Sequence, residues 1–371
     1  MKAKLSLFLA FLLLLSVFFV LPASAAPSVS AKSAVLIEAE SGRVLYQKNA
    51  FIRLPMASTT KIMTAIVAIE KGDLSKTVTV AKEAVGVEGS SIYLEAGEKL
   101  TLESLLYALL LQSANDAATA IAIEVGGSVE GFAKLMNEKA DELGLTATHF
   151  TNPHGLDDEE HYTSAYDLAK ITAYALRNEI FKTVCSTYKK TIPKGENGTR
   201  VLVNHNKLLR LYDGAIGVKT GFTKRSGRCL VGAAERDGLM LVSVTLSAPD
   251  DWNDHKEMLD FGFARYERLT LAKKGEFTAP LPLTGGTADY AIAANADEIS
   301  AMLPRSHGEI TYRIEAPQIL VAPVRVGDCL GRVVYLCDGE EIASSDLVAA
   351  NSVDAPTKKF SLWRWITSLF G

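Results

Sequence analysis

The chain has 371 residues, of which 48% are hydrophobic, 22% charged and 8% aromatic. This composition excludes a disordered, collagen-like or coiled-coil chain, and the net charge of -4 leaves no general basic field for nucleic acid. Four cysteines, none in a C-x-x-C pair, are too few for a disulfide scaffold. Six histidines without H-E-x-x-H spacing give no reason to expect a metal or another cofactor.

The N-terminus has the pattern of a secretory signal. Two lysines precede an apolar run over residues 5–21, and Ala23-Ser24-Ala25 supplies a small-residue cleavage site. We therefore expect a signal peptide over 1–25, and export from the cytoplasm. The alternative is an uncleaved anchor, because about 17 apolar residues approach the length of a membrane span.

The elements that follow mix strands and helices, which predicts an α+β fold. A hairpin is expected over 34–47, with a turn at Glu40-Ser41-Gly42-Arg43. The leucines from Leu102 to Leu110 recur at helical spacing and predict a helix with one buried face. The other predicted helices cover 58–71, 116–125, 129–143, 164–177 and 253–266, and the other strands cover 215–220, 229–234 and 239–247.

The sequence pattern changes after about residue 277, where short segments typical of β-strands are separated by glycine and proline residues. Strands are expected over 309–315, 318–323 and 332–336, with a helical turn near 297–303. This predicts a large domain over 26–274 and a small all-β domain over 275–355. A disulfide between Cys329 and Cys337 is an alternative, but we favour unpaired, buried thiols for these two residues.

The last residues, 356–371, predict an amphipathic helix. At helical spacing one broad arc is apolar and the other polar. The apolar arc consists of Leu362, Trp363, Trp365, Ile366, Leu369 and Phe370. The segment is too short to span a bilayer, but tryptophans and basic residues suit the membrane interface, so we favour attachment to a membrane surface through 358–371. The alternative is a helix docked on its own domain.

Ser58-Thr59-Thr60-Lys61 is the first motif with chemical meaning. A spacing of three on a helix places Ser58 and Lys61 on one face. A serine hydroxyl becomes a nucleophile when a neighbouring base takes its proton, and a lysine can be that base if burial or another cation lowers its pKa. Because serine and lysine are common, this motif alone is weak.

Two further motifs follow. Ser113-Ala114-Asn115 comes directly after the leucine-rich helix; it is either a plain loop with Asn115 or Asp116 capping the next helix, or a site in which Ser113 relays a proton and Asn115 orients Lys61 and the substrate. Lys219-Thr220-Gly221 ends a predicted strand and is either an exposed edge or a carboxylate-binding strand. Gly221 would let the backbone come close to a ligand, and Lys219 would help to keep Lys61 neutral.

The ordered trio of motifs resembles the serine-type D-alanyl-D-alanine carboxypeptidases, the low-molecular-mass penicillin-binding proteins. The likeness extends to Gly89-Ser90-Ser91, to Asn152-Pro153-His154-Gly155-Leu156, to the β domain and to the tail. It implies a β-lactamase/transpeptidase-like catalytic domain, an antiparallel sheet with helices. It also implies a location on the outer face of the bacterial cytoplasmic membrane.

The resemblance implies that Ser58 attacks the penultimate D-Ala carbonyl of a peptidoglycan stem peptide, with Lys61 as base and Ser113 as proton relay. Thr220 and Lys219 would bind the terminal carboxylate beside Asn115 and Gly221. The N–H groups of Ser58 and Phe222 would form the oxyanion hole. β-Lactam antibiotics would acylate Ser58 as mimics of D-Ala-D-Ala.

The stretch 248–252 lacks an arginine that could grip the substrate carboxylate. His154 is interpreted as orienting a turn over the site. The rival functions are a peptidoglycan DD-endopeptidase, a β-lactamase, for which no E-x-x-x-N-type loop is found, and a non-catalytic wall-binding or antibiotic-sensing protein.

Overall fold

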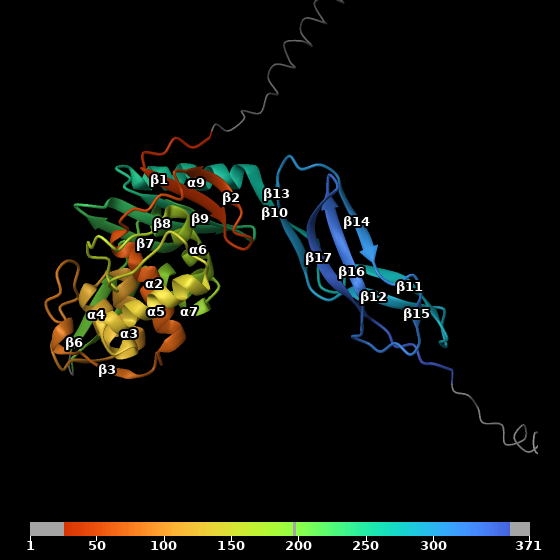
Figure 1. Cartoon of the computed structure of the whole chain (residues 1–371), viewed down its shortest axis with the longest axis horizontal. Coiled ribbons are helices and arrows are strands. Elements are labelled where there is room, and N and C mark those ends of the chain that lie inside the picture. The colour runs from red at the N-terminus through yellow and green to blue at the C-terminus, as the bar shows by residue number, and fades with distance from the viewer. Residues whose placement is uncertain (1–25, 196–197, 357–371) are drawn as a thin grey trace, which may run out of the picture. The chain divides into compact units, whose positions relative to one another are not determined.

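The computed structural model describes residues 26–195 and 198–356 (Figure 1). The described chain forms two compact units, divided between Ala264 and Arg265. The predicted signal peptide and the predicted C-terminal helix lie outside the described residues. Within those residues, no helix has both the length and the apolar character needed to cross a membrane.

The first unit contains a five-stranded antiparallel sheet in the order β2-β1-β9-β8-β7. Its strands are β1 (Ser33–Glu38), β2 (Val44–Lys48), β7 (Ala215–Thr223), β8 (Gly227–Arg236) and β9 (Leu239–Leu246). The predicted hairpin is confirmed by the pairing of β1 with β2. The turn between β8 and β9 has positive φ at Asp237 and Gly238, as a tight hairpin requires.

Both faces of this sheet are covered, because every residue of β1 is buried and so are nearly all of β9. On one face Val242 and Val244 join the main hydrophobic core, and on the other Ser243 contacts His255 of the last helix. Figure 1 shows that helix, α9 (Asp251–Arg265), on one side of the sheet and the larger group of helices, α2 to α7, on the other. Strand β7 is left at the edge of the sheet, with one side open to a ligand.

The helices of this unit are η2 (Ala57–Thr60), α2 (Lys61–Lys71), η3 (Lys82–Ala84), α3 (Leu102–Leu111), α4 (Asn115–Gly126), α5 (Val129–Glu142), α6 (Ala165–Leu176), α7 (Glu179–Ser186), α8 (Leu208–Leu211) and α9 (Asp251–Arg265). Two short antiparallel strand pairs were not predicted: β3 (Thr77–Thr79) with β4 (Lys99–Thr101), and β5 (Lys189–Lys194) with β6 (Gly198–Val203). The leucine pattern correctly predicts α3. However, α3 is buried around most of its circumference rather than on one face, because it packs against α2, α4 and α7 in the core.

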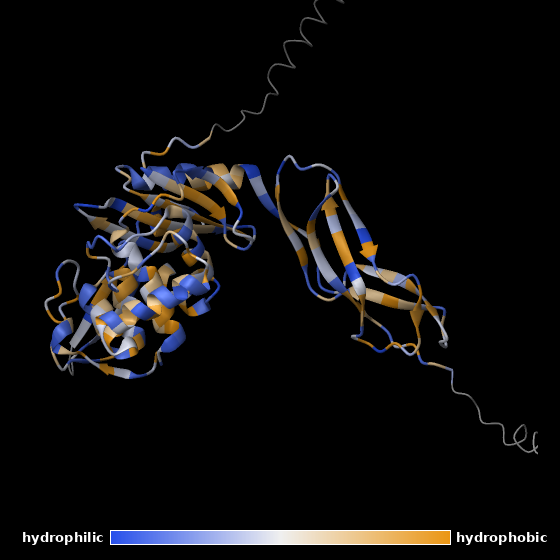
Figure 2. Ribbon diagram, in the orientation of Figure 1, coloured by the Kyte–Doolittle hydropathy of each residue, from blue (hydrophilic) through white to orange (hydrophobic). Residues whose placement is uncertain are grey.

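The second unit is all β. A six-stranded sheet has the order β14-β16-β17-β12-β11-β15, and a separate pair joins β10 to β13. Its strands are β10 (Tyr266–Ala272), β11 (Thr278–Thr284), β12 (Tyr290–Asn295), β13 (Ile299–Pro304), β14 (Ile310–Glu315), β15 (Leu320–Val321), β16 (Cys329–Cys337) and β17 (Glu340–Ala349). Buried and exposed residues alternate along β11, and Figure 2 shows hydrophobic and hydrophilic residues alternating along strands of this unit.

Two expectations for this region differ from the structure. The prediction of a helical turn near 297–303 is wrong. Strand β13 occupies this region, pairs with β10 over its whole length and alternates between buried and half-buried residues. That pairing also places residues 265–274 with the second unit, so the chain divides after Ala264 rather than after Lys274. All four cysteines are free, but Cys329 is exposed rather than buried.

Candidate active site

Ser58 and Lys61 lie where the short helix η2 runs into α2. The half-buried Ser58 is the second residue of η2, and the buried Lys61 is the first residue of α2. The Lys61 Nζ atom lies 3.0 Å from the Ser58 Oγ atom. The two side chains of the S-x-x-K motif are therefore in direct contact.

The Lys61 amine has three polar neighbours. Besides Ser58 it contacts the Asn115 Oδ1 atom at 2.7 Å and the His154 carbonyl oxygen at 2.6 Å, and both of these oxygens can only accept. A neutral amine has two N–H donors and one lone pair. If its donors satisfy Asn115 and His154, the lone pair points at the Ser58 hydroxyl and can accept its proton.

The surroundings favour that neutral form. Burial and the nearby Lys219 amine lower the pKa of Lys61 well below its ordinary value, and Asp116 opposes them. Burial also lowers the pKa of Lys219 to about 7. Lys219 is 1% exposed and donates to the Thr220 carbonyl oxygen at 2.8 Å. Burial thus disfavours the charged form of both amines.

Asn115 is fixed by the chain around it. It is the first residue of α4, and its N–H donates to the Ser90 carbonyl at 2.7 Å while its side-chain amide donates to the Glu88 carbonyl. The N-cap of α4 is Ala114, with no side-chain capping bond. The alternative in which Asn115 caps this helix is therefore wrong, because its side chain binds Lys61 and the Glu88 carbonyl oxygen. The Asp116 carboxylate does accept from the Ala117 N–H of the first turn, at 2.9 Å. Ser113, in the loop before α4, is buried and has a left-handed backbone with φ of 58°.

Lys219, Thr220, Gly221 and Phe222 follow one another on edge strand β7. A Cβ atom on Gly221 would lie 3.1 Å from the Met56 oxygen and from the Ser58 and Thr59 nitrogens. The strand therefore passes directly beside the backbone of Ser58, and a side chain at 221 would force the two apart. Phe222, the next residue, is 66% exposed.

The Asn152–Leu156 turn closes over η2. The Asn152 Oδ1 atom accepts from the Gly155 N–H, and a Cβ at Gly155 would collide with the Ala57 carbonyl oxygen. Burial and the neighbouring Lys61 lower the pKa of His154 to about 3, so its imidazole is neutral. His154 contacts Lys61 through its backbone carbonyl oxygen.

Arg228, which none of the sequence motifs contains, lies on β8 directly across from Phe222. The Arg228 guanidinium donates to the buried Asp251 carboxylate at 2.8 Å and lies 6.0 Å from the centre of the Trp252 ring, yet its side chain is 45% exposed. Cross-strand partners share a face of a sheet, so Thr220, Phe222 and Arg228 lie on one face and Lys219 on the other. The sequence feature that could have indicated Arg228 is its position just after the tight turn that follows the K-T-G motif.

Within residues 26–195 and 198–356, no three His, Cys, Asp or Glu side chains gather closely enough to hold a metal ion.

Comparison with known proteins bears directly on this arrangement. Residues 21–250 match the family model of D-alanyl-D-alanine carboxypeptidases of the S11 peptidase class, and residues 266–355 match that of the C-terminal domain of penicillin-binding protein 5. The chain belongs to the D-alanyl-D-alanine carboxypeptidase family. As members of this family are serine peptidases, it is a serine hydrolase.

Individual relatives agree with this family assignment. The carboxypeptidase DacF of Bacillus subtilis is 37% identical, with 86% of this chain and 85% of the relative covered. DacA of Escherichia coli is 31% identical, covering 88% and 84%. The crystal structure of penicillin-binding protein 5 from Haemophilus influenzae has a TM-score of 0.72 at 30% identity, covering 89% of this chain and 99% of that one.

Proposed function

We propose that the protein removes the terminal D-alanine from peptidoglycan stem peptides through an acyl-enzyme on Ser58. The contact between Ser58 Oγ and Lys61 Nζ, in surroundings that favour a neutral amine, carries the proposal. Relatives named D-alanyl-D-alanine carboxypeptidase support the choice of substrate.

In the first step, Lys61 takes the Ser58 proton while Oγ attacks the penultimate D-Ala carbonyl carbon. Collapse of the tetrahedral intermediate breaks the C–N bond, and the departing D-alanine amine takes up the proton, which Ser113 relays. Water then attacks the ester, its proton returns to the Ser58 oxygen, and the shortened peptide leaves. The close approach of Gly221 to the Ser58 nitrogen supports an oxyanion site formed by the N–H groups of Ser58 and Phe222.

Asn115 would hold Lys61 in place and contact the substrate amide. Thr220 and Lys219 would bind the terminal carboxylate of the substrate, and we add Arg228 to them. Arg228 is a diagonal neighbour of Thr220 on the same face of the sheet and keeps nearly half of its side chain exposed. Its pairing with Asp251 fixes the guanidinium while leaving donors for a carboxylate. β-Lactam antibiotics would acylate Ser58 by the same route, which the similarity to penicillin-binding proteins supports.

The substrate also requires a location outside the cytoplasm. The signal-like segment 1–25 supports export, and the amphipathic pattern over 358–371 supports attachment to the outer face of the cytoplasmic membrane.

The test is the Ser58→Ala variant. Release of D-alanine from a D-Ala-D-Ala-ended pentapeptide should fall by a factor on the order of 10^4 or more, and labelling by fluorescent penicillin should disappear. Ser186→Ala, which alters an exposed serine at the end of α7, should leave both unchanged. Intact-mass measurement should show a persistent penicilloyl adduct; rapid hydrolysis of the antibiotic would indicate a β-lactamase, and labelling that survives in Ser58→Ala would exclude this nucleophile.

A further inference from the structure

Tyr93 combines two features that are unfavourable for a folded chain. Its side chain is 81% exposed, and its backbone is left-handed, with φ of 57°. A bulky residue rarely adopts this conformation unless its surroundings impose it. Because the ring buries little surface, packing of Tyr93 itself does not explain why this conformation is kept.

The chain on both sides of Tyr93 is held by the Asp116 carboxylate, which is 1% exposed. The carboxylate accepts from the Ser91 hydroxyl at 2.6 Å, from the Leu94 N–H at 3.0 Å and from the Ile92 N–H at 3.2 Å. Ile92 and Leu94 are also buried in the hydrophobic core. Residues 91–94 are therefore anchored on either side of the exposed ring.

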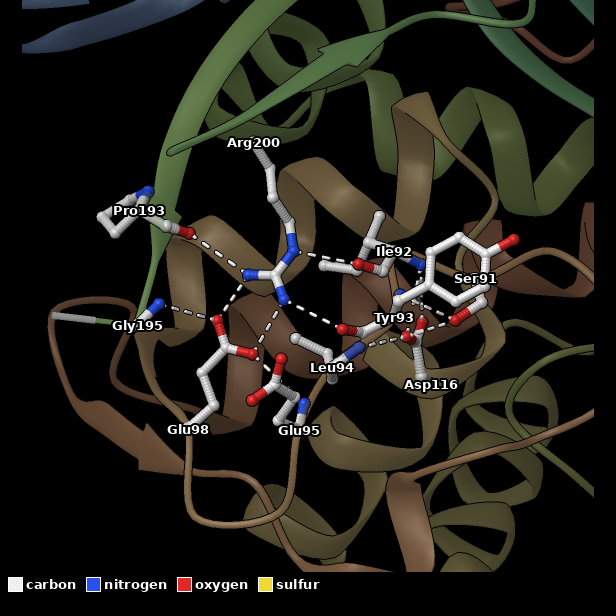
Figure 3. A network of polar contacts seen from close by, with 10 residues as sticks. All are labelled: Ser91, Ile92, Tyr93, Leu94, Glu95, Glu98, Asp116, Pro193, Gly195 and Arg200. Carbon is white, nitrogen blue, oxygen red and sulfur yellow. Dashed lines mark hydrogen bonds and ion pairs between the residues drawn. The ribbon is translucent and has the colours of Figure 1, made fainter. Parts of the chain in front are cut away.

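A second buried charge holds the carbonyl groups of the same segment. Arg200 of β6 donates to the Ile92 oxygen at 2.9 Å and to the Tyr93 oxygen at 3.0 Å. Its guanidinium is paired with both carboxylate oxygens of Glu98, and the Gly195 N–H also donates to Glu98. Figure 3 shows this network, with the Tyr93 ring projecting away from it. The two side chains of the ion pair are 9% and 4% exposed.

Burying a charged pair and an additional carboxylate is costly unless every donor and acceptor is used. Here Asp116 and the Glu98–Arg200 pair all hold residues 91–94, and the large exposed side chain of that segment is the Tyr93 ring. This arrangement preorganises the Tyr93 backbone for contact with a ligand, because little conformational freedom remains to be lost on binding. An aromatic ring with one hydroxyl suits a partner that is partly apolar and partly polar.

The segment is continuous with the candidate active site. The Glu88 and Ser90 carbonyls bind Asn115, and Gly89, with φ of 94°, brings its backbone against the Asn115 side chain. Residues 88–94 are thus linked to the candidate site by the contacts of Glu88 and Ser90 with Asn115, the first residue of α4. Strand β7, with the proposed carboxylate-binding residues, approaches Ser58 from the sheet. Residues 88–90 are thus linked to Lys61 through Asn115, whereas β7 lies beside the backbone of Ser58.

We propose that Tyr93 is a specificity-determining contact for the acyl side of the substrate, meaning the stem-peptide residues that precede D-Ala-D-Ala. Asp116 and the Glu98–Arg200 pair are positioning residues for this contact. The inference rests on the proposed carboxypeptidase activity and names the part of the same substrate that the K-T-G strand does not hold.

The experiment compares two substrates, a full-length stem pentapeptide and its N-acetylated last three residues. In Tyr93→Ala, kcat/KM for the pentapeptide should fall about tenfold, through KM, whereas the value for the tripeptide should stay within about twofold of wild type. Tyr93→Phe should keep most of the preference for the pentapeptide. Tyr290→Ala is the matched control, because Tyr290 is an exposed tyrosine of the second unit and its loss should change neither substrate.

The positioning role is tested by Arg200→Lys, which keeps the charge but loses the fork that reaches both carbonyls. It should reproduce the selective rise in KM, with stoichiometric penicillin labelling as the measure of an intact site. If Arg200→Lys does not fold, Glu98→Gln is measured in the same way. Normal pentapeptide KM in the folded variant would overturn the positioning role.

Other outcomes separate this inference from the function on which it rests. Equal losses for both peptides in Tyr93→Ala, or no loss for either, would overturn the specificity role alone. A wild-type protein that releases D-alanine from neither peptide would overturn the proposed function and this role with it.

Discussion

The chemistry of Lys61 depends on how its amine is surrounded. Two acceptor-only oxygens and one hydroxyl lie around Nζ, and a second buried amine lies close enough to lower its pKa. A protonated amine could donate to all three oxygens but could not accept the Ser58 proton. In the proposed mechanism, the pKa of Lys61 therefore decides whether Ser58 can become a nucleophile.

The lowered pKa of Lys61 predicts the pH dependence of acylation. Only the neutral amine can act as base, so the rate of labelling by fluorescent penicillin should rise with pH through the pKa of Lys61. Since burial and Lys219 lower that pKa, the midpoint should lie well below 10.5, the ordinary value for lysine. In Lys219→Gln the repulsion is lost, the pKa of Lys61 rises, and the midpoint should move to higher pH.

Lys134→Gln serves as the control for this measurement, because Lys134 is an exposed lysine of α5 and should leave the midpoint unchanged. A wild-type midpoint near 10.5, or a downward shift in Lys219→Gln, would contradict the assignment of Lys61 as the base.

At the scale of elements, the site is assembled from the edge of the sheet and the starts of two helices. Gly221 allows β7 to pass beside η2, and α4 begins with the asparagine that holds Lys61. Strand β8 adds Arg228, which the first turn of α9 holds through Asp251. No single element contains a complete binding site, so packing of strands against helices determines its geometry.

The proposed carboxylate site predicts a defect in substrate binding for Arg228→Gln. Loss of a charged hydrogen bond of about 1.5–3 kcal/mol corresponds to a roughly 10- to 100-fold rise in KM for a D-Ala-D-Ala-ended peptide. The same peptide with an amidated C-terminus should be a poor substrate of both forms, because it has no carboxylate to bind. Steady-state kinetics with both peptides measures the effect.

Arg313→Gln, which alters a half-exposed arginine of β14 in the second unit, should behave as wild type. If Arg228→Gln lowers turnover of the free acid and the amide by the same factor, Arg228 supports the fold of the strand and does not bind the carboxylate.

At the scale of the whole molecule, the chain joins a catalytic unit to an all-β unit with its own core. The second core is formed by strands β10–β17 and includes Leu281, Val333 and Leu347. The last described residues, up to Pro356, belong to this second unit, and the amphipathic segment follows it in sequence. Attachment through the tail would therefore leave the proposed catalytic residues in a separate folded unit.

Deletion of residues 357–371 tests this arrangement. The truncated protein should move from the membrane fraction to the soluble fraction and release D-alanine from a free pentapeptide at a rate within about twofold of wild type, because the site residues lie in another unit. A tail of the same composition, scrambled to break the apolar arc, is the control and should also bind vesicles poorly. Equal membrane partition of the full-length and truncated proteins would contradict the anchor.

Much of the candidate site was accessible from the order and spacing of motifs. Ser58 and Lys61 meet because three residues along a helix bring side chains to one face, and a short-range rule of this kind needs no knowledge of the rest of the fold. The β1–β2 hairpin and helix α3 were predicted for the same reason. The short antiparallel pair β3–β4 was missed because three-residue strands carry little periodic signal.

The amino-acid sequence by itself determined the local elements, the three motifs and the family that they indicate. Only the tertiary structure decided which distant groups meet them: Arg228 with Asp251, Arg200 with Glu98, and Asp116 with the segment that presents Tyr93. It also assigned residues 265–274 to the second unit, through the pairing of β10 with β13. The physical reason is that such partners are chosen by burial and by the need to satisfy every buried charge, and these depend on the packing of elements that are far apart in the chain.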